Sequence, residues 1–127
     1  MDKGTGTRQH APVFDLEVMK DVCSRHGAAL LPTLPESMIA VADNVQPGAF
    51  PINGLRHRQG STSGWFIWAG EEPGQADDFF KPVHAAHLAE RCPAAVRMLG
   101  LAEGWRFLLA DGYEDVWFDA SLLDDSV

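Results

Sequence analysis

The sequence predicts a single α+β domain, in which an antiparallel sheet of four to five strands packs against two to three helices. Three observations lead to this prediction. A chain of 127 residues fits one domain and is long enough for a real core. Apolar residues make up 46% of it, with seven Phe and four Trp, which is not the composition of a disordered chain. Strand-like and helix-like segments both occur, without an internal repeat, a low-complexity tract or a domain boundary.

The N-terminal part predicts one helix after a flexible tail. Residues 1–12 are polar and contain glycine, and we expect them to be flexible. Asp15 is a suitable N-cap for a helix that runs to about His26, and Gly27 is a suitable C-terminal stop. Apolar residues at helical spacing predict the buried face of this helix: Leu16, Met19, Val22 and Cys23.

The central strand of the sheet is predicted at residues 65–68, the densest aromatic run in the chain. It carries large apolar groups on both faces, so we expect other parts of the chain to pack against both faces of the sheet here. Residues 43–54 are rich in turn residues and predict a loop. The basic segment 55–59 follows this loop, and we expect it to form an outer strand that leads toward the central one. Three further strands are expected at residues 37–42, 105–110 and 113–119, the last two joined by a hairpin turn at Asp111 and Gly112.

Two short helices are predicted after the central strand. Pro82 suits the first turn of a helix that runs to about Glu90, on which His84 and His87 would share a face. This histidine spacing is the most metal-like in the chain, but no third ligand accompanies it, and we expect no metal site. A second helix is expected at residues 94–99, ended by Gly100.

Charge and cysteine content limit the partners of the protein. Eighteen acidic residues against ten basic ones give a net charge of −8, which disfavours nucleic acid and anionic membranes and favours a basic partner. No apolar run approaches the roughly 20 residues of a membrane span, and the N-terminus has no signal-peptide core. Cys23 and Cys92 do not make a disulfide framework. We therefore expect a soluble, cytoplasmic protein with two reduced thiols.

Motifs of catalysis are absent from the sequence. It has no glycine-rich phosphate loop after a strand and no G-x-S-x-G nucleophile elbow. Adjacent carboxylates occur at residues 71–72, 77–78 and 114–115, and such pairs are more typical of a solvated edge than of acid–base chemistry. We therefore expect neither an enzyme nor a cofactor.

Several segments together carry a family resemblance. The strand start Ser63-Gly64-Trp65, the exit Gly70-Glu71 and the upstream segment 54–58 are followed by DDFFKPVHAAHL and LGLAEGWRFLLADGYEDVWFD. Over residues 38–123 this series resembles the small bacterial proteins classed as immunity family thirty-three, formerly a domain of unknown function. The first thirty-odd residues carry none of the resemblance. It implies a protein that binds a cognate toxin, and it assigns no catalytic residues.

Three hypotheses of function follow. In the first, an acidic surface with aromatic anchors binds a basic toxin, and it comprises Trp68, Glu71, Glu72, Asp77, Asp78 and Phe79. In the second, the chain is a small ligand-binding or enzymatic domain with an anion site built from Arg56, Arg58, His84 and His87. Against it, a basic cluster such as residues 56–58 usually pairs with nearby carboxylates. In the third, the aromatic residues are buried by self-association, and the oligomeric state stays open.

Overall fold

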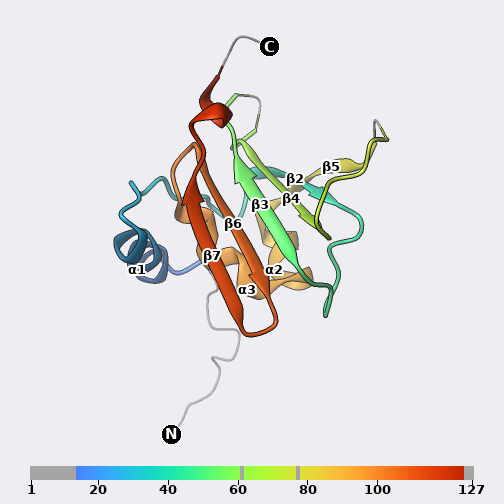
Figure 1. Cartoon of the computed structure of the whole chain (residues 1–127), viewed down its shortest axis with the longest axis horizontal. Helices are drawn as coiled ribbons and strands as arrows, with labels where there is room; N and C mark the ends of the chain where they lie inside the picture. The colour runs from blue at the N-terminus through green and yellow to red at the C-terminus, as the bar shows by residue number, and fades with distance from the viewer. Residues whose placement is uncertain (1–13, 61, 77, 125–127) are drawn as a thin grey trace, which may run out of the picture.

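The computed structural model describes residues 14–60, 62–76 and 78–124, so the predicted tail at residues 1–12 lies outside the described residues. Six strands form one mostly antiparallel sheet in the order β5-β2-β4-β3-β6-β7, with α2 and α3 behind it in Figure 1 and α1 to the left, near β7. The strands are β2 (Met38–Ala42), β3 (Ile52–Arg56), β4 (Trp65–Ala69), β5 (Phe80–His84), β6 (Trp105–Ala110) and β7 (Tyr113–Phe118). The α+β class is confirmed, but the predicted number of four to five strands is too low, because the sheet has six.

Helix α1 (Leu16–His26) begins and ends where the sequence predicts. The Asp15 carboxylate accepts a hydrogen bond from the backbone N–H of Glu17, and Gly27 ends the helix with a φ of 71°. Met19, Val22 and Cys23 form its buried stripe, as expected. The prediction for Leu16 is wrong, because this side chain is 45% exposed.

Strand β4 is central, as predicted, and pairs with β2 in parallel and with β3 in antiparallel fashion. Its side chains Trp65 and Ile67 are completely buried in the core that the sheet shares with the helices. Phe66 and Trp68 point to the other face, where the ring of Phe80 lies 5.2 Å from Phe66 and 6.1 Å from Trp68. Both faces of β4 are therefore packed, as expected: helices lie against one face and aromatic rings against the other.

Strand β3 corrects two predictions. It starts at Ile52, inside the segment expected to be a loop, and it is an inner strand between β4 and β6 rather than an outer one. Gly54 is required here by packing, since a Cβ at this position would lie 2.2 Å from the ring of Phe107. Asn53 is also held in place, because its side-chain amide donates to the carbonyl oxygen of Gly70 at 2.7 Å. Tertiary contacts thus override the turn preference of both residues.

Strand β5 is the strand that the sequence reasoning missed. Pro82 lies within it, although the residue was expected in the first turn of a helix. The sheet tolerates proline here because β5 is an edge strand, where a missing N–H can face solvent. Helix α2 (Ala85–Arg91) begins only after His84, its N-cap, so His84 and His87 do not share one helix.

The C-terminal part matches the prediction more closely. Helix α3 (Pro93–Val96) continues into a 3₁₀ helix, η2 (Arg97–Gly100), in place of the single helix expected at residues 94–99. Strands β6 and β7 form the predicted hairpin, with Ala110 opposite Tyr113 across the turn. A second 3₁₀ helix, η3 (Ala120–Leu123), follows them. In the part of the chain that the structure describes, no helix has both the length and the apolar character needed to cross a membrane.

Candidate functional site

The loop between β4 and β5 carries the predicted acidic surface, and it lies at the β5 side of the sheet, away from the β6–β7 hairpin (Figure 1). The side chains of Glu71, Glu72 and Asp78 are exposed, and Asp77 lies outside the described residues. Among the residues described, no partner forms a hydrogen bond or ion pair with the carboxylate of Glu71 or Glu72. These two charges are therefore available to another molecule.

Phe79 anchors the end of this loop. The residue is half-buried, and its ring meets that of Phe80 edge-on, with the centroids 4.9 Å apart. It also packs closely on the loop itself, because a Cβ at Gly74 would lie 2.6 Å from its ring. The structure thus places Phe79 beside the acidic residues, where it orients the loop.

Trp68 is not part of the exposed surface. Its side chain is only 2% exposed, and it stands opposite Asn53 in the sheet. The indole N–H is buried without a hydrogen-bond partner among the described residues. This placement corrects the expectation that Trp68 contacts a partner directly, because so buried a side chain has almost no surface to offer one.

Arg56, proposed above as an anion ligand, points into the core. The side chain is completely buried, and it donates hydrogen bonds to three backbone carbonyls, those of Leu31, Ser63 and Leu101, at 2.6 to 3.0 Å. Its guanidinium lies 5.4 Å from the centroid of the Trp65 ring. Burial lowers the pKa of Arg56 to about 10, so the group stays charged near neutral pH. Arg56 therefore joins segments that are distant in sequence and has no access to a solvent anion.

The neighbours of Arg56 in the basic cluster also bind the protein itself. Arg58 donates to the carbonyl oxygen of Leu123 at 3.0 Å, and Nδ1 of His57 lies 3.3 Å from the carbonyl oxygen of Leu122. Both contacts reach η3. Among the described residues, the side-chain hydrogen bonds of this cluster reach backbone carbonyls, and its expected pairing with nearby carboxylates stays a prediction.

The two histidines of the alternative site lie elsewhere. The rings of His84 and His87 are 6.0 Å apart and line a shallow hollow of about 290 Å³ with Pro35, Glu36 and Ala86. Neither Arg56 nor Arg58 lines this hollow, so the four residues do not converge on one site. Within residues 14–60, 62–76 and 78–124, no group of three or more His, Cys, Asp or Glu side chains is placed to hold a metal ion.

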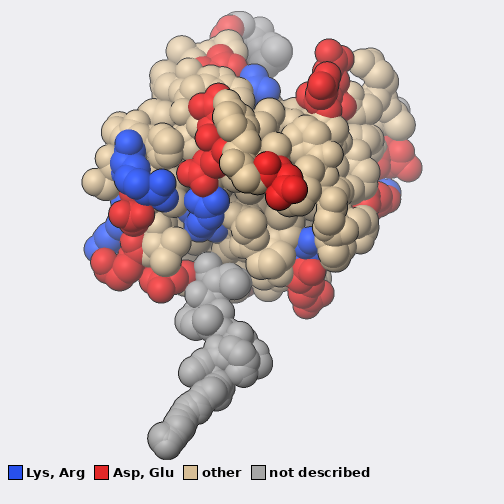
Figure 2. Space-filling view, turned by 60° about the horizontal axis from the view of Figure 1, so that its bottom comes forward, with Lys and Arg blue, Asp and Glu red and all other residues tan. Residues whose placement is uncertain are grey.

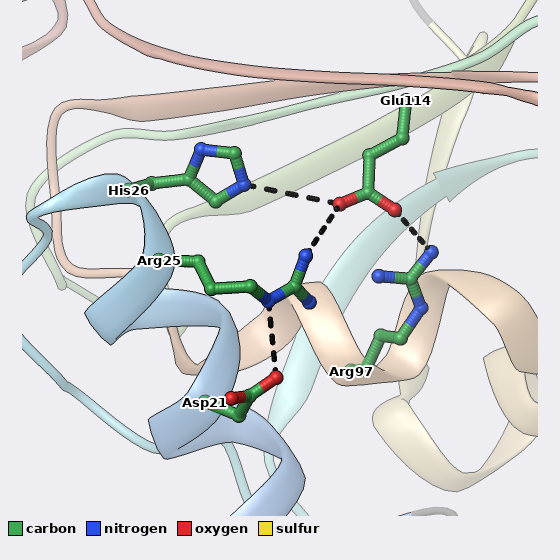
Figure 3. Close-up of polar contacts among 5 residues, drawn as sticks. All are labelled: Asp21, Arg25, His26, Arg97 and Glu114. Carbon is green, nitrogen blue, oxygen red and sulfur yellow. Dashed lines mark hydrogen bonds and ion pairs between the residues drawn. The ribbon is translucent and has the colours of Figure 1, made fainter.

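The structure also assembles a charged cluster around Glu114, which the sequence showed only as one of two adjacent carboxylates. One carboxylate oxygen of Glu114 accepts a hydrogen bond from Arg97 at 2.6 Å (Figure 3). The other lies 3.7 Å from Arg25 and 3.8 Å from Nε2 of His26. Arg25 in turn contacts Asp21 at 3.0 Å. We call these five residues the Glu114 cluster.

The Glu114 cluster connects β7 with α1 and η2. Glu114 stands opposite Leu109 in the β6–β7 ladder, so its side chain lies on the same face of the sheet as the core. The hydrogen bond from Arg97 lowers the pKa of Glu114, with smaller contributions from Arg25 and His26, while desolvation opposes them. The alternation of side chains along β7 could have predicted the inward position of Glu114, because it places Glu114 on the same face as Val116, which packs against the core.

Charge compensation is uneven over the molecule. Several cations of the described residues pair with carboxylates of the same chain: Lys20 with Glu17, Arg25 with Asp21, Lys81 with Asp43, Arg97 with Glu114 and Arg106 with Asp119. Figure 2 views one face of the molecule, and the largest group of basic side chains in this view lies at the left, intermixed with acidic ones. Other carboxylates of the described residues have no hydrogen bond or ion pair: Glu36, Glu71, Glu72, Glu90, Asp111 and Asp115. The charge left for a partner is therefore negative.

Comparison with known proteins adds one finding to this geometry. A family model described as the Imm33-like domain matches residues 18–119, from within α1 to just after β7. The match begins earlier than the resemblance noted from residue 38, so most of α1 is included. No curated protein and no solved structure matches the chain. Because the matched span is well over half of the sequence, the chain belongs to the Imm33-like domain family.

Proposed function

We propose that the protein is an immunity-type protein that neutralises a cognate toxin by stoichiometric binding. The observation that carries this proposal is the family match over residues 18–119. An immunity-type family implies a toxin partner in general. The mechanism is occlusion: the protein covers a surface that the toxin needs, and no chemistry on the toxin takes place.

The charge distribution supports a basic toxin as the partner. Cations such as Arg97 and Arg106 are already bound to carboxylates of the same protein, whereas Glu71 and Glu72 are exposed and unpaired among the described residues. A field of one sign that is not compensated internally accelerates the encounter with a partner of opposite sign. It also disfavours acidic proteins and nucleic acid by like-charge repulsion.

The loop between β4 and β5 is the binding surface that we propose. Glu71, Glu72 and Asp78 are its exposed charges, and Asp77 extends the series in the sequence. Phe79 and Phe80 hold the end of the loop by their edge-on contact, which limits the entropy lost when a partner binds. Charge pairs that lose their water in such an interface contribute on the order of 1.5–7 kcal/mol each in measured cases.

The alternative anion site has less support. Arg56 is buried and donates to carbonyls, and Arg58 donates to the carbonyl oxygen of Leu123. His84 and His87 line a hollow without either arginine. The proposal therefore rests on protein binding.

The test has two stages. The tagged protein is used to isolate a partner from its native lysate, and the purified partner is then expressed alone and together with the protein. We expect the partner to arrest growth, the protein to restore it, and calorimetry to give a one-to-one complex that weakens as salt rises. A partner that is not toxic, or a toxin that the protein does not neutralise, contradicts the proposed function.

The surface is tested with two double variants of equal net charge. Glu71→Lys with Glu72→Lys is expected to weaken binding at least tenfold, which corresponds to about 1.4 kcal/mol. The control combines Glu36→Lys with Glu90→Lys, which reverses two exposed carboxylates outside the loop that are unpaired among the described residues, and we expect a loss below about threefold. Equal losses in the two variants would show that only net charge matters and would overturn this surface.

A further inference from the structure

A hollow of about 340 Å³ lies beside the β6–β7 hairpin, and none of its lining residues belongs to the loop between β4 and β5, which we call the acidic loop. Phe50 and Tyr113 line it, and these two residues are 48% and 57% exposed. Leu109, Ala110 and Ala94 complete the apolar lining. Two large aromatic side chains are thus left accessible around one concave site, which is an arrangement typical of a binding pocket.

The polar groups of this hollow leave one negative charge unbalanced. Arg97 and Glu114 line it, but they are bound to each other at 2.6 Å. Arg25 lies between Glu114 and Asp21, so the arginines and carboxylates of the Glu114 cluster compensate one another. Asp111 also lines the hollow, and its carboxylate has no hydrogen bond or ion pair among the described residues. The hollow therefore attracts a cation.

An arginine side chain matches these features. Its planar guanidinium stacks on aromatic rings such as those of Phe50 and Tyr113, and it forms charge-assisted hydrogen bonds with a carboxylate such as Asp111. Its aliphatic stem suits the apolar wall. The volume is near the lower end for ligand pockets, which favours one side chain over a larger ligand.

We propose that this hollow binds an arginine side chain presented by a basic partner protein, as a second anchor apart from the acidic loop. The identity of the partner as a toxin rests on the proposed function above. Arginine binding itself depends only on the hollow and is measured without the toxin.

The experiment is an NMR titration of the full chain with N-acetyl-arginine amide, monitored by the backbone amides. N-acetyl-citrulline amide serves as the matched probe, since it has nearly the same shape without the charge. We expect saturable shifts at Ala94 and at residues 110–114 with the arginine compound, and at least fivefold weaker binding of the citrulline compound. Equal binding of both probes, or shifts spread over the whole acidic surface, would overturn the inference.

Variants locate the charge that is recognised. Asp111→Asn is expected to weaken arginine binding at least fivefold and to keep the fold, because Asn-Gly is a favoured hairpin turn. Asp115→Asn is the matched control: it removes another exposed carboxylate, which does not line the hollow and has no hydrogen bond or ion pair among the described residues, and we expect unchanged binding. Tyr113→Leu should weaken binding about twofold to fivefold through the lost cation–π contact. Unchanged binding in Asp111→Asn would overturn the assignment.

The outcomes separate this inference from the proposed function. If the toxin is neutralised but N-acetyl-arginine amide does not bind at the hollow, the inference is wrong and the function stands. If arginine binds as expected but no toxin is neutralised, the proposed function is wrong and the site stands. If both hold, Asp111→Asn should also weaken toxin binding.

Discussion

Charged side chains on the helix-covered side of the sheet differ from those of the loop between β4 and β5. Arg56 and Glu114 both point toward the helices, and each contacts several groups of the same protein. Glu71 and Glu72 are as strongly charged, but they have no partner among the described residues. The first pair connects elements that are distant in the sequence, whereas the second pair faces solvent.

The difference separates charges that serve folding from charges that serve recognition. Burying a charge costs free energy unless its hydrogen bonds are satisfied. The charged groups of Arg56 and Glu114 therefore need their partners within the protein. An exposed, unpaired carboxylate contributes little to stability and keeps its full capacity for an external cation. Substitutions in the two regions should therefore change different quantities.

The largest effect on stability is expected from Arg56→Met, which keeps an unbranched side chain but removes the donors. The carbonyl oxygens of Leu31, Ser63 and Leu101 would lose their hydrogen bonds inside the protein. We expect the free energy of unfolding to fall by about 3 kcal/mol or more, measured by urea denaturation. Arg58→Met, at an exposed position, is the control and should cost less than about 1 kcal/mol. Similar losses in both variants would contradict a special role for the buried guanidinium.

A smaller loss is expected from Glu114→Gln, which removes the charge that Arg25 and Arg97 share. These two cations would then lie near each other without their common carboxylate. Partial exposure of the cluster limits the effect to about 1–2 kcal/mol in the free energy of unfolding. Glu71→Gln and Glu72→Gln should change stability by less than about 0.5 kcal/mol each. A loop variant as destabilising as Glu114→Gln would break the distinction between the two regions.

The smallest effect is a dependence on acid pH. The pKa of Glu114 is lowered in the folded protein, so the unfolded chain binds a proton at this site more readily. The stabilisation by Glu114 is therefore present above its unfolded pKa of about 4.3 and is lost as pH falls through the lower folded value. We expect the stability difference between wild type and Glu114→Gln to shrink on acidification, as measured by urea denaturation from pH 6 to about pH 3. A difference that stays constant over this range would show that Glu114 does not act through its charge.

Local signals in the sequence were sufficient for elements that depend on neighbouring residues. The caps of α1 at Asp15 and Gly27 and the Asp111-Gly112 hairpin lie where predicted, and so does the central position of β4. Strand β5 was missed because proline opposes strands in general, and only its edge position makes Pro82 acceptable. The start of β3 was missed because Gly54 is defined by the ring of Phe107, which comes from a distant strand.

Features of the candidate site also fall into those that local sequence predicts and those that tertiary contacts determine. The sequence by itself determined the family core, the excess of negative charge and the exposed carboxylates of the acidic loop, because these depend on composition and on short segments. Only the tertiary structure decided that Arg56 and Trp68 are buried, that Glu114 joins Arg25 and Arg97, and that Phe50 and Tyr113 line one hollow. The physical reason is that desolvation and ion pairing depend on distances between residues far apart in the chain, and the packing of sheet and helices sets those distances.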